Sequence, residues 1–167
     1  YKEYKYIIGF FGLFIYHLMF KLVSWKANLI SCRSHLLKGK SGKIVSPSQL
    51  NEKWFQVRKK ANLNKVELLY IGRIKIEKGI FSLLKIFDEI KIDGQLSIVG
   101  RTENIKTRNK KINIIGHKYD PTELIKIYDD HNIIILPSFT EAHPKVIDES
   151  LARARPVIIF EEIKHII

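Results

Sequence analysis

The pattern of apolar and polar positions becomes regular at residue 66. From there on, short unbroken runs of Ile, Leu and Val alternate with segments whose apolar residues recur at helical spacing. The pattern predicts strands at 67–71, 95–99, 112–115, 132–136 and 156–160, with helices at 80–90, 121–128 and 146–153. Strands that are apolar on both faces and separated by helices are typical of a covered parallel sheet. We therefore expect an α/β domain, a Rossmann-like parallel sheet with helices on both faces.

The first 65 residues are less regular. Residues 6–20 form an uncharged, aromatic-rich run that ends at Lys21 and predicts a helix. A membrane-spanning helix needs roughly 18–20 apolar residues, so this run is short for one. A core helix of a partly missing domain is the favoured interpretation, a helix lying on an anionic membrane is the second, and a true span is the least favoured. Residues 25–32 predict a short buried strand.

Turn-forming residues and a charged segment separate these two parts of the chain. Residues 51–64 resemble a short linker helix, and we place the domain boundary within 46–65. The expected organisation is a C-terminal remnant of a preceding domain at 1–45, a linker at 46–65 and the regular domain at 66–167. The chain begins without methionine and ends just after a strand. We expect a fragment of a longer protein, with its last domain truncated.

The net charge of +12 is unevenly distributed along the chain. Residues 1–65 carry 13 Lys and Arg against two acidic residues, and the remainder carries 16 against 15. Such asymmetry indicates that the first part faces a polyanion. Its cations are interleaved with a long apolar run and not with an aromatic stacking platform, which favours an anionic membrane surface over nucleic acid.

Cysteine and histidine usage bounds the compartment and the metal content. Cys32 is the single cysteine, so an intrachain disulfide is impossible and a reducing compartment fits. No His/Cys cluster has metal-ligand spacing, and we expect no structural zinc. The expected location is the cytoplasm, including the inner face of the membrane.

Candidate chemistry falls at the carboxyl ends of predicted strands, where ligands bind in open α/β sheets. Gly72 and Arg73 follow the first strand, and Lys78 precedes the next helix. Two cations beside a helix N-terminus suit a diphosphate, although ordinary surface cations explain them equally well. Gly116 and His117 follow the third strand, and a glycine there permits a close approach of backbone to a ligand. His117 alone is more often a polar surface residue than a base.

The stretch from Leu136 to Ala152 reads as strand end, loop and helix. It carries Glu141 on the loop and Glu149 in the first turns of the helix. Glu149 can accept hydrogen bonds from a ribose diol, Glu141 can meet a sugar hydroxyl, and the amides of 142–146 can face phosphate or sugar oxygens. As an isolated pair the two glutamates are a weak signal, because a favourable interaction with the helix dipole explains Glu149 equally well.

Several short segments, in one order and spacing, raise the specificity of this pattern. They are Tyr70–Ile74 with Glu77–Gly79, Leu96–Gly100, Ile115–Gly116, Leu124–Tyr128, Ile135–Ser138, Glu141–Ala152 and Arg155–Ile158. Through them, residues 66–160 resemble the C-terminal, donor-binding domain of retaining glycosyltransferases of the GT-B fold, in glycosyltransferase family 4 (group 1). Residues 1–45 resemble the end of the preceding acceptor domain more weakly.

The resemblance implies a role for each matching residue. Arg73 and Lys78 would bind the donor diphosphate and steady the departing nucleotide, Glu141 would lie against the transferred sugar, and Glu149 would bind the ribose. Arg73, Lys78 and Glu141 are thus the catalytic candidates. The remaining candidate substrate-binding residues are Gly72, Gly116, His117, Ala142, His143, Pro144, Lys145 and Val146.

The implied reaction is transfer of a hexose from a nucleotide-diphosphate sugar to a glycan or lipid-linked acceptor, with retention of configuration and without metal or other cofactor. Cell-envelope polysaccharide synthesis is the implied setting. The family often has Gly-Phe or Gly-Leu where this chain has Ala142-His143. The sugar preference therefore stays open.

Two other classes remain to be weighed. A non-catalytic nucleotide-binding module, or an inactive glycosyltransferase paralogue, would show the same site pattern. An NAD-binding Rossmann domain is disfavoured, because no G-x-G-x-x-G follows the first strand of the sheet. Without the acceptor half of the cleft, we expect the 167-residue chain to be inactive by itself.

Overall fold

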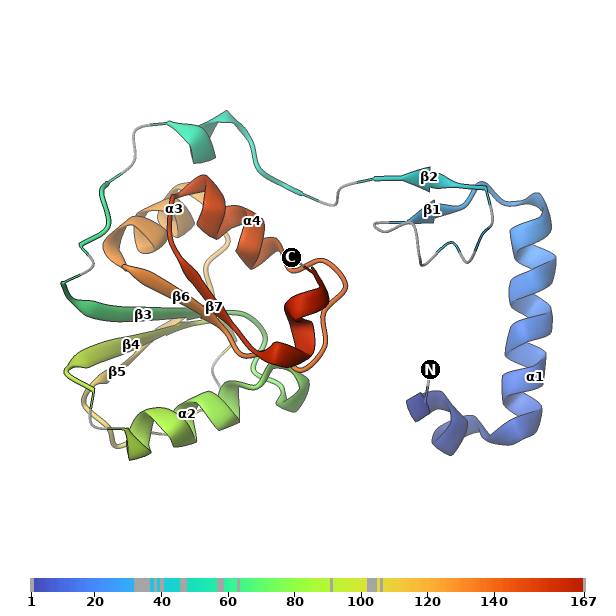
Figure 1. Cartoon of the computed structure of the whole chain (residues 1–167), viewed down its shortest axis with the longest axis horizontal. Helices are drawn as coiled ribbons and strands as arrows, with labels where there is room; N and C mark the ends of the chain where they lie inside the picture. The colour runs from blue at the N-terminus through green and yellow to red at the C-terminus, as the bar shows by residue number, and fades with distance from the viewer. Residues whose placement is uncertain are drawn as a thin grey trace. The chain divides into compact units, whose positions relative to one another are not determined.

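The structure is a computed structural model. It describes residues 2–31, 37, 39, 41–45, 48–56, 59–62, 64–90, 92–101, 105 and 107–166. The chain divides into two compact units, residues 1–47 and 48–167 (Figure 1). Cys32, on which the expectation of a reducing compartment rests, lies outside the described residues.

The second unit is built on a parallel sheet of five strands in the order β5-β4-β3-β6-β7. The strands are β3 (Val66–Ile71), β4 (Gly94–Val99), β5 (Ile112–Gly116), β6 (Ile133–Leu136) and β7 (Val157–Ile159). The helices are α2 (Ile80–Glu89), α3 (Pro121–Asp130) and α4 (Lys145–Ala152), with short 3-10 turns η2 (Glu52–Phe55), η3 (Ile76–Lys78) and η4 (Glu161–Ile166). The expected Rossmann-like α/β architecture is confirmed.

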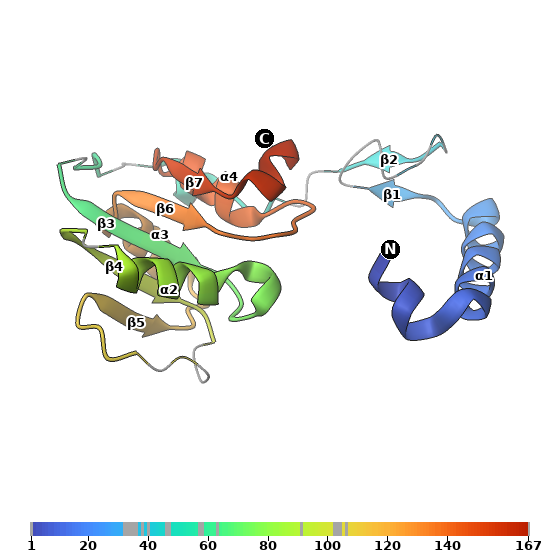
Figure 2. The same cartoon turned by 60° about the horizontal axis from the view of Figure 1, so that its bottom comes forward.

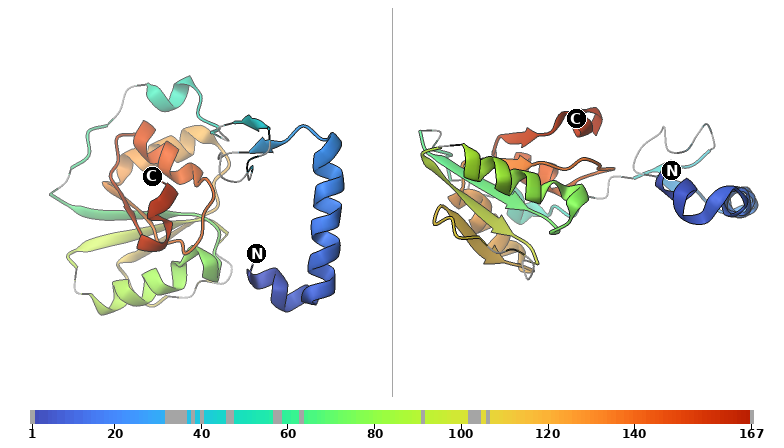
Figure 3. Two further views of the ribbon diagram at one scale, coloured as in Figure 1. Left: turned by 45° about the vertical axis from the view of Figure 1, so that its right-hand side comes forward. Right: turned by 90° about the horizontal axis from the view of Figure 1, so that it is seen from below.

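Helices cover the two faces of this sheet (Figure 2, Figure 3), and a hydrophobic cluster lies on each face. Side chains alternate along β3, so Leu68 and Tyr70 pack with α2, whereas Leu69 packs with α3 and α4. Both faces are therefore buried, which explains why the strands read as continuous apolar runs.

The strand order reverses between β3 and β6. The chain runs outward from β3 to β4 and β5, then returns to pair β6 with the free side of β3, Leu68 opposite Ile133. The helix after β3 covers one face, and the helix after β6 covers the other (Figure 2). Such a reversal is the point at which open α/β sheets bind ligands.

Two buried arginines tie the segment before β3 to this unit. Arg153 donates from Nε and Nη2 to the two carboxylate oxygens of Asp129 at 3.0 and 2.6 Å, and from Nη1 to the carbonyl of Trp54 at 2.9 Å. Arg155 donates to the carbonyl of Lys59 at 2.7 Å. The segment that the sequence presents as a linker is therefore packed into the second unit. In its described residues, the helical part is the four-residue turn η2.

The first unit contains α1 (Lys2–Lys26) and two short parallel strands, β1 (Ile30–Ser31) and β2 (Lys43–Ile44). The helix predicted at 6–20 is confirmed and extends further, with a non-helical residue at Gly9. The buried strand predicted at 25–32 is wrong. Trp25 belongs to the helix and is 81% exposed, and Ile30 is 65% exposed. Among the described residues, β1 pairs with β2, and each strand contributes two residues.

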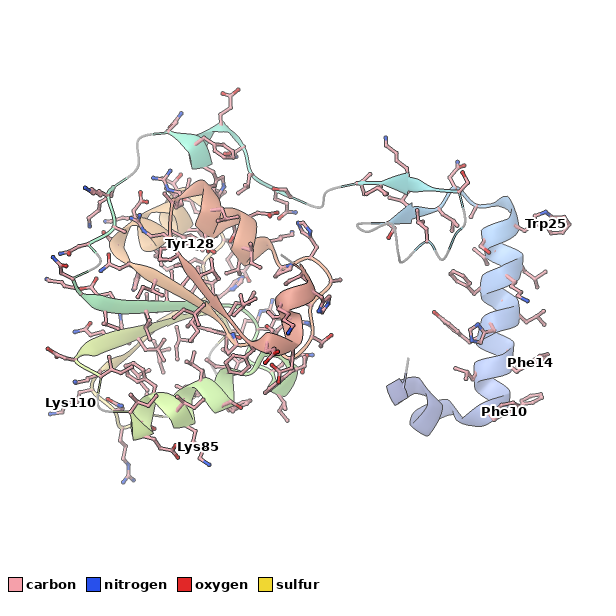
Figure 4. The ribbon with its side chains drawn as sticks, in the orientation of Figure 1. Phe10, Phe14, Trp25, Lys85, Lys110 and Tyr128 are labelled. Carbon is pink, nitrogen blue, oxygen red and sulfur yellow. The ribbon has the colours of Figure 1, made fainter. Side chains whose placement is uncertain are left out.

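Most apolar side chains of α1 are exposed in the described part of the chain, among them Phe10, Phe14 and Trp25 (Figure 4). Within the described residues, no helix combines the length and hydrophobicity needed to cross a bilayer.

We expect Asp129→Ala to lower the free energy of unfolding by about 3–5 kcal/mol, because it leaves the Arg153 guanidinium buried without its carboxylate. Urea unfolding followed by tryptophan fluorescence measures this. Asp130→Ala is the matched control, since Asp130 pairs with Lys59 on the exposed surface and its loss should leave the urea midpoint unchanged. Equal effects of the two substitutions would contradict the structural role of the arginine cluster.

Candidate functional site

The loop after β3 and the loop after β6 touch through their backbones. Gly79 has φ 65°, and a Cβ placed there would lie 1.7 Å from the carbonyl oxygen of Pro137. The amide of Phe139 donates to the carbonyl of Glu77 at 3.0 Å. Only glycine allows this approach, so the two loops are held in contact at the carboxyl ends of β3 and β6.

Lys78 and Glu141, predicted from separate motifs, form an ion pair across this contact. Lys78 Nζ lies 2.5 Å from Glu141 Oε1, and the Ser138 hydroxyl donates to the same oxygen at 2.8 Å. The side chains of Lys78 and Glu141 are only 17% and 11% exposed. Both donors meet Oε1, so the carboxylate is fixed in orientation and Oε2 remains for another partner.

Arg73 lies on the same loop and is open to solvent. Its side chain is 66% exposed, and its guanidinium is 4.0 Å from Glu77, the limit of an ion pair. The backbone beneath it is fixed, because the phenol of Tyr70 donates to the Arg73 carbonyl at 2.7 Å. Burial raises the pKa of Tyr70, so that phenol stays protonated. An exposed guanidinium on a fixed backbone can bind an anion bidentately.

Glu149 lies in the second turn of α4 and is partly buried. Its Oε2 accepts a hydrogen bond from the phenol of Tyr128 at 2.7 Å. Burial raises the pKa of Glu149, while the bond from Tyr128 and the charge of Lys145 oppose that rise. A carboxylate with a raised pKa in the N-terminal half of a helix that follows a strand of the sheet is a candidate ligand-binding group.

The loop from Glu141 to α4 is held by a side-chain pair. His143 Nε2 lies 2.9 Å from Asp148 Oδ2 in the first turn of α4. Pro144 is the N-cap residue and supplies no capping side chain, so this pair fixes the start of the helix. Ala142, Lys145 and Val146 complete the segment, the first two exposed and the last half-buried.

Glycines end the three neighbouring strands β3, β4 and β5. A Cβ on Gly100 would lie 2.1 Å from the carbonyl oxygen of Gly72, and the amide of Gly100 donates to the carbonyl of Gly116 at 3.1 Å. The exposed His117 meets Tyr119 edge to face, with ring centroids 4.2 Å apart. Since β4 separates β5 from β3, Gly116 and His117 lie further along the sheet edge than Lys78.

The sequence did not reveal three contributors to this site. Ser138, Tyr128 and Gly100 lie in segments that carry the family resemblance, but none of them was assigned a role. Tyr128 reads as part of an apolar helix stripe, and Gly100 reads as a simple strand end. Helical spacing identifies a buried face but not what a hydroxyl on it contacts. In the described part of the chain, no three His, Cys, Asp or Glu side chains lie together as a metal site would require.

Comparison with known families assigns the class of protein. Residues 52–165 match the family model described as glycosyl transferases group 1. This match covers more than half of the chain, and the chain therefore belongs to the group 1 glycosyltransferases.

The similarity to individual proteins is low, at 26% sequence identity or less for those described below. The chain is 26% identical over 155 residues to TuaC of Bacillus subtilis (strain 168), a protein named as a teichuronic acid biosynthesis glycosyltransferase. That alignment covers 83% of this chain and 40% of TuaC, so the chain spans less than half the length of this relative.

Solved structures share the fold at low identity. Sucrose-phosphate synthase from Thermosynechococcus elongatus aligns with a TM-score of 0.59 and 23% identity over 75% of this chain and 37% of its own. The lipopolysaccharide outer core galactosyltransferase WaaB aligns with a TM-score of 0.63 and 16% identity over 82% of this chain and 44% of its own. HepE of Anabaena, solved with UDP and glucose, also gives 0.63, with 13% identity over 86% and 47%.

The loop contact predicts a difference between two glycines with positive φ. Gly79→Ala should cost about 1–2 kcal/mol for the left-handed backbone, and about 1–3 kcal/mol more for the clash with Pro137. Gly116→Ala is the control, because its φ is 82° but nothing lies within 4 Å of the added Cβ, so only the backbone cost applies. Urea unfolding of both variants measures the difference. Equal destabilisation would mean that the two loops are not in contact.

Proposed function

We propose that the protein is part of a family 4 glycosyltransferase that transfers a hexose from a nucleotide-diphosphate sugar with retention of configuration. The observation that carries the proposal is the Lys78–Glu141 ion pair, formed by the loops after β3 and β6, where the strand order reverses. Arg73 lies on one contributing loop and Glu149 on the helix that follows the other. Two cations and two carboxylates at this point match the parts of a diphosphate-sugar donor.

Departure of a nucleoside diphosphate develops negative charge on its phosphate oxygens. Arg73 and Lys78 would stabilise that charge, Arg73 through its fork of donors and Lys78 as a point charge. Such preorganised stabilisation is the main catalytic contribution in this proposal. The cations take the place that a metal ion would have, so the reaction is proposed to need none. Glu141 would contact the transferred sugar through Oε2, and Glu149 the ribose.

The identity of the substrates is proposed from the relatives. HepE and the pneumococcal O-GlcNAc transferase GtfA were solved with UDP and a sugar. The names of TuaC and WaaB refer to teichuronic acid and lipopolysaccharide. From these ligands and names we propose a nucleotide-sugar donor and a glycan or lipid-linked acceptor of the cell envelope. We also propose a cytoplasmic location. Residues 1–45 would be the end of an acceptor domain.

The alternative is a non-catalytic nucleotide-binding module or an inactive paralogue. Calorimetry with nucleoside diphosphates tests binding, and turnover of nucleotide sugars by the complete reading frame separates an enzyme from a module. Binding without turnover across a panel of donors and acceptors would favour the module.

Arg73→Ala, made in the complete reading frame, should lower the rate of sugar transfer by about 100-fold or more, because it removes charge stabilisation of the leaving group. Glu149→Ala should raise the KM for the donor by about tenfold or more through the lost ribose contact. Steady-state kinetics with the best donor measures both. Lys75→Ala is the control, since Lys75 is an exposed cation on the same loop. Near-normal turnover in both site variants would sink the proposal.

The positive first part of the chain is proposed to lie on an anionic membrane surface. We expect the protein to sediment with vesicles containing phosphatidylglycerol at low salt and to be released at about 1 M salt, where the Debye length is about 3 Å. Vesicles of phosphatidylcholine alone serve as the control. A protein that stays in the supernatant at every salt concentration contradicts this membrane role.

A further inference from the structure

Glu149 is hydrogen-bonded to a tyrosine to which the sequence assigned no role. Tyr128, on α3, is fully buried in the interior of the second unit (Figure 4). Its hydroxyl is 2.7 Å from Glu149 Oε2, across 21 residues of sequence. This hydrogen bond connects α3, before β6, to α4, after β6.

The direction of this hydrogen bond is fixed. Burial, together with the nearby charge of Glu149, raises the pKa of Tyr128 well above its ordinary value, so the phenol keeps its proton. Tyr128 therefore donates and Glu149 accepts through Oε2. Oε1 then remains for the hydroxyls of a ligand.

The phenol ring is itself held in place. The ring of Trp54 packs edge to face on that of Tyr128, with centroids 5.6 Å apart. Arg155 Nε donates to the carbonyl of Tyr128 at 2.9 Å. A hydroxyl on a ring fixed in this way can hold a carboxylate in one orientation, which is the requirement for a preorganised binding group.

We propose that Tyr128 is a positioning residue for Glu149: its phenol fixes one carboxylate oxygen and thereby orients the other toward the ribose of the donor. This inference rests on the proposed function, in which Glu149 binds ribose. Tyr128 itself touches no substrate.

The titration of Glu149 makes this role measurable. The groups that act on it are Tyr128 from α3 and Lys145 and Asp148 from α4. Burial raises the pKa of Glu149, and the Tyr128 hydrogen bond is the first of the influences that lower it. Loss of the hydroxyl therefore raises that pKa further. A protonated carboxyl accepts hydrogen bonds less well, so nucleotide affinity is lost at a higher pH.

The experiment is calorimetric titration of the protein with UDP, GDP and ADP between pH 5 and pH 8.5, comparing wild type with Tyr128→Phe. For the wild type, affinity should fall toward acid pH. For Tyr128→Phe, the Kd near pH 6 should be about fivefold to tenfold larger than that of wild type. The midpoint of the acid limb should lie at higher pH, and the difference from wild type should narrow at pH 8.5.

Trp54→Phe is the matched control, because it removes packing from the same ring but leaves the hydroxyl of Tyr128 in place. It should lower thermal stability and leave the midpoint of the acid limb at its wild-type pH. Glu149→Gln is a second, independent variant, whose amide does not titrate. It should lose the part of the acid limb that Glu149 causes and keep only the part due to protonation of the nucleotide's terminal phosphate, whose pKa is about 6.

Each result decides the inference. A Tyr128→Phe profile identical to wild type, or an acid limb in Glu149→Gln as deep as that of wild type, overturns the positioning role alone while nucleotide binding stands. An equal shift in Trp54→Phe also overturns it, because the effect would then be general loosening. Failure of the wild type to bind any of the three nucleotides overturns the proposed function together with this inference.

Discussion

The backbone contact between Gly79 and Pro137 is the constraint on which the site depends. Neighbouring parallel strands whose helices leave on opposite faces bring two loops together, and here they approach to a distance at which no side chain fits. Lys78 precedes that glycine, and Glu141 lies four residues beyond that proline. Their ion pair therefore follows from the path of the backbone, and both side chains are fixed before any ligand arrives.

In this arrangement the charges of Lys78 and Glu141 compensate each other without a ligand. Lys78 and Glu141 neutralise each other at low exposure, which limits the cost of burying either charge. Arg73, open to solvent, remains the cation that an incoming anion meets first. In the proposed function, a diphosphate would first meet this exposed guanidinium and then the ammonium of Lys78, which is held at a fixed position, so that capture of the anion is separate from its alignment.

The sequence predicted the parts of the structure that depend on local pattern. Short apolar runs identified the five strands of the sheet, and their carboxyl ends located Lys78 and Glu141 on one edge. Contacts between distant residues were beyond such reasoning. Arg153 and Arg155 look like surface cations in the sequence, yet they are 1% and 2% exposed and bind carbonyls about 100 residues earlier. The strand expected at 25–32 failed for the same reason, since burial depends on partners that the local pattern does not reveal.

Two carboxylates near Tyr128, those of Asp129 and Glu149, differ in how their charge is compensated. Asp129 receives a bidentate guanidinium, so its charge is fully compensated. Glu149 receives one phenol, and burial still raises its pKa. A raised carboxyl pKa means that the folded state holds the proton more tightly than the unfolded state. Its contribution to stability is therefore present at acid pH and is lost as the pH rises through that pKa. A buried carboxylate that costs stability at neutral pH is a candidate for a binding role, which is the role proposed for Glu149.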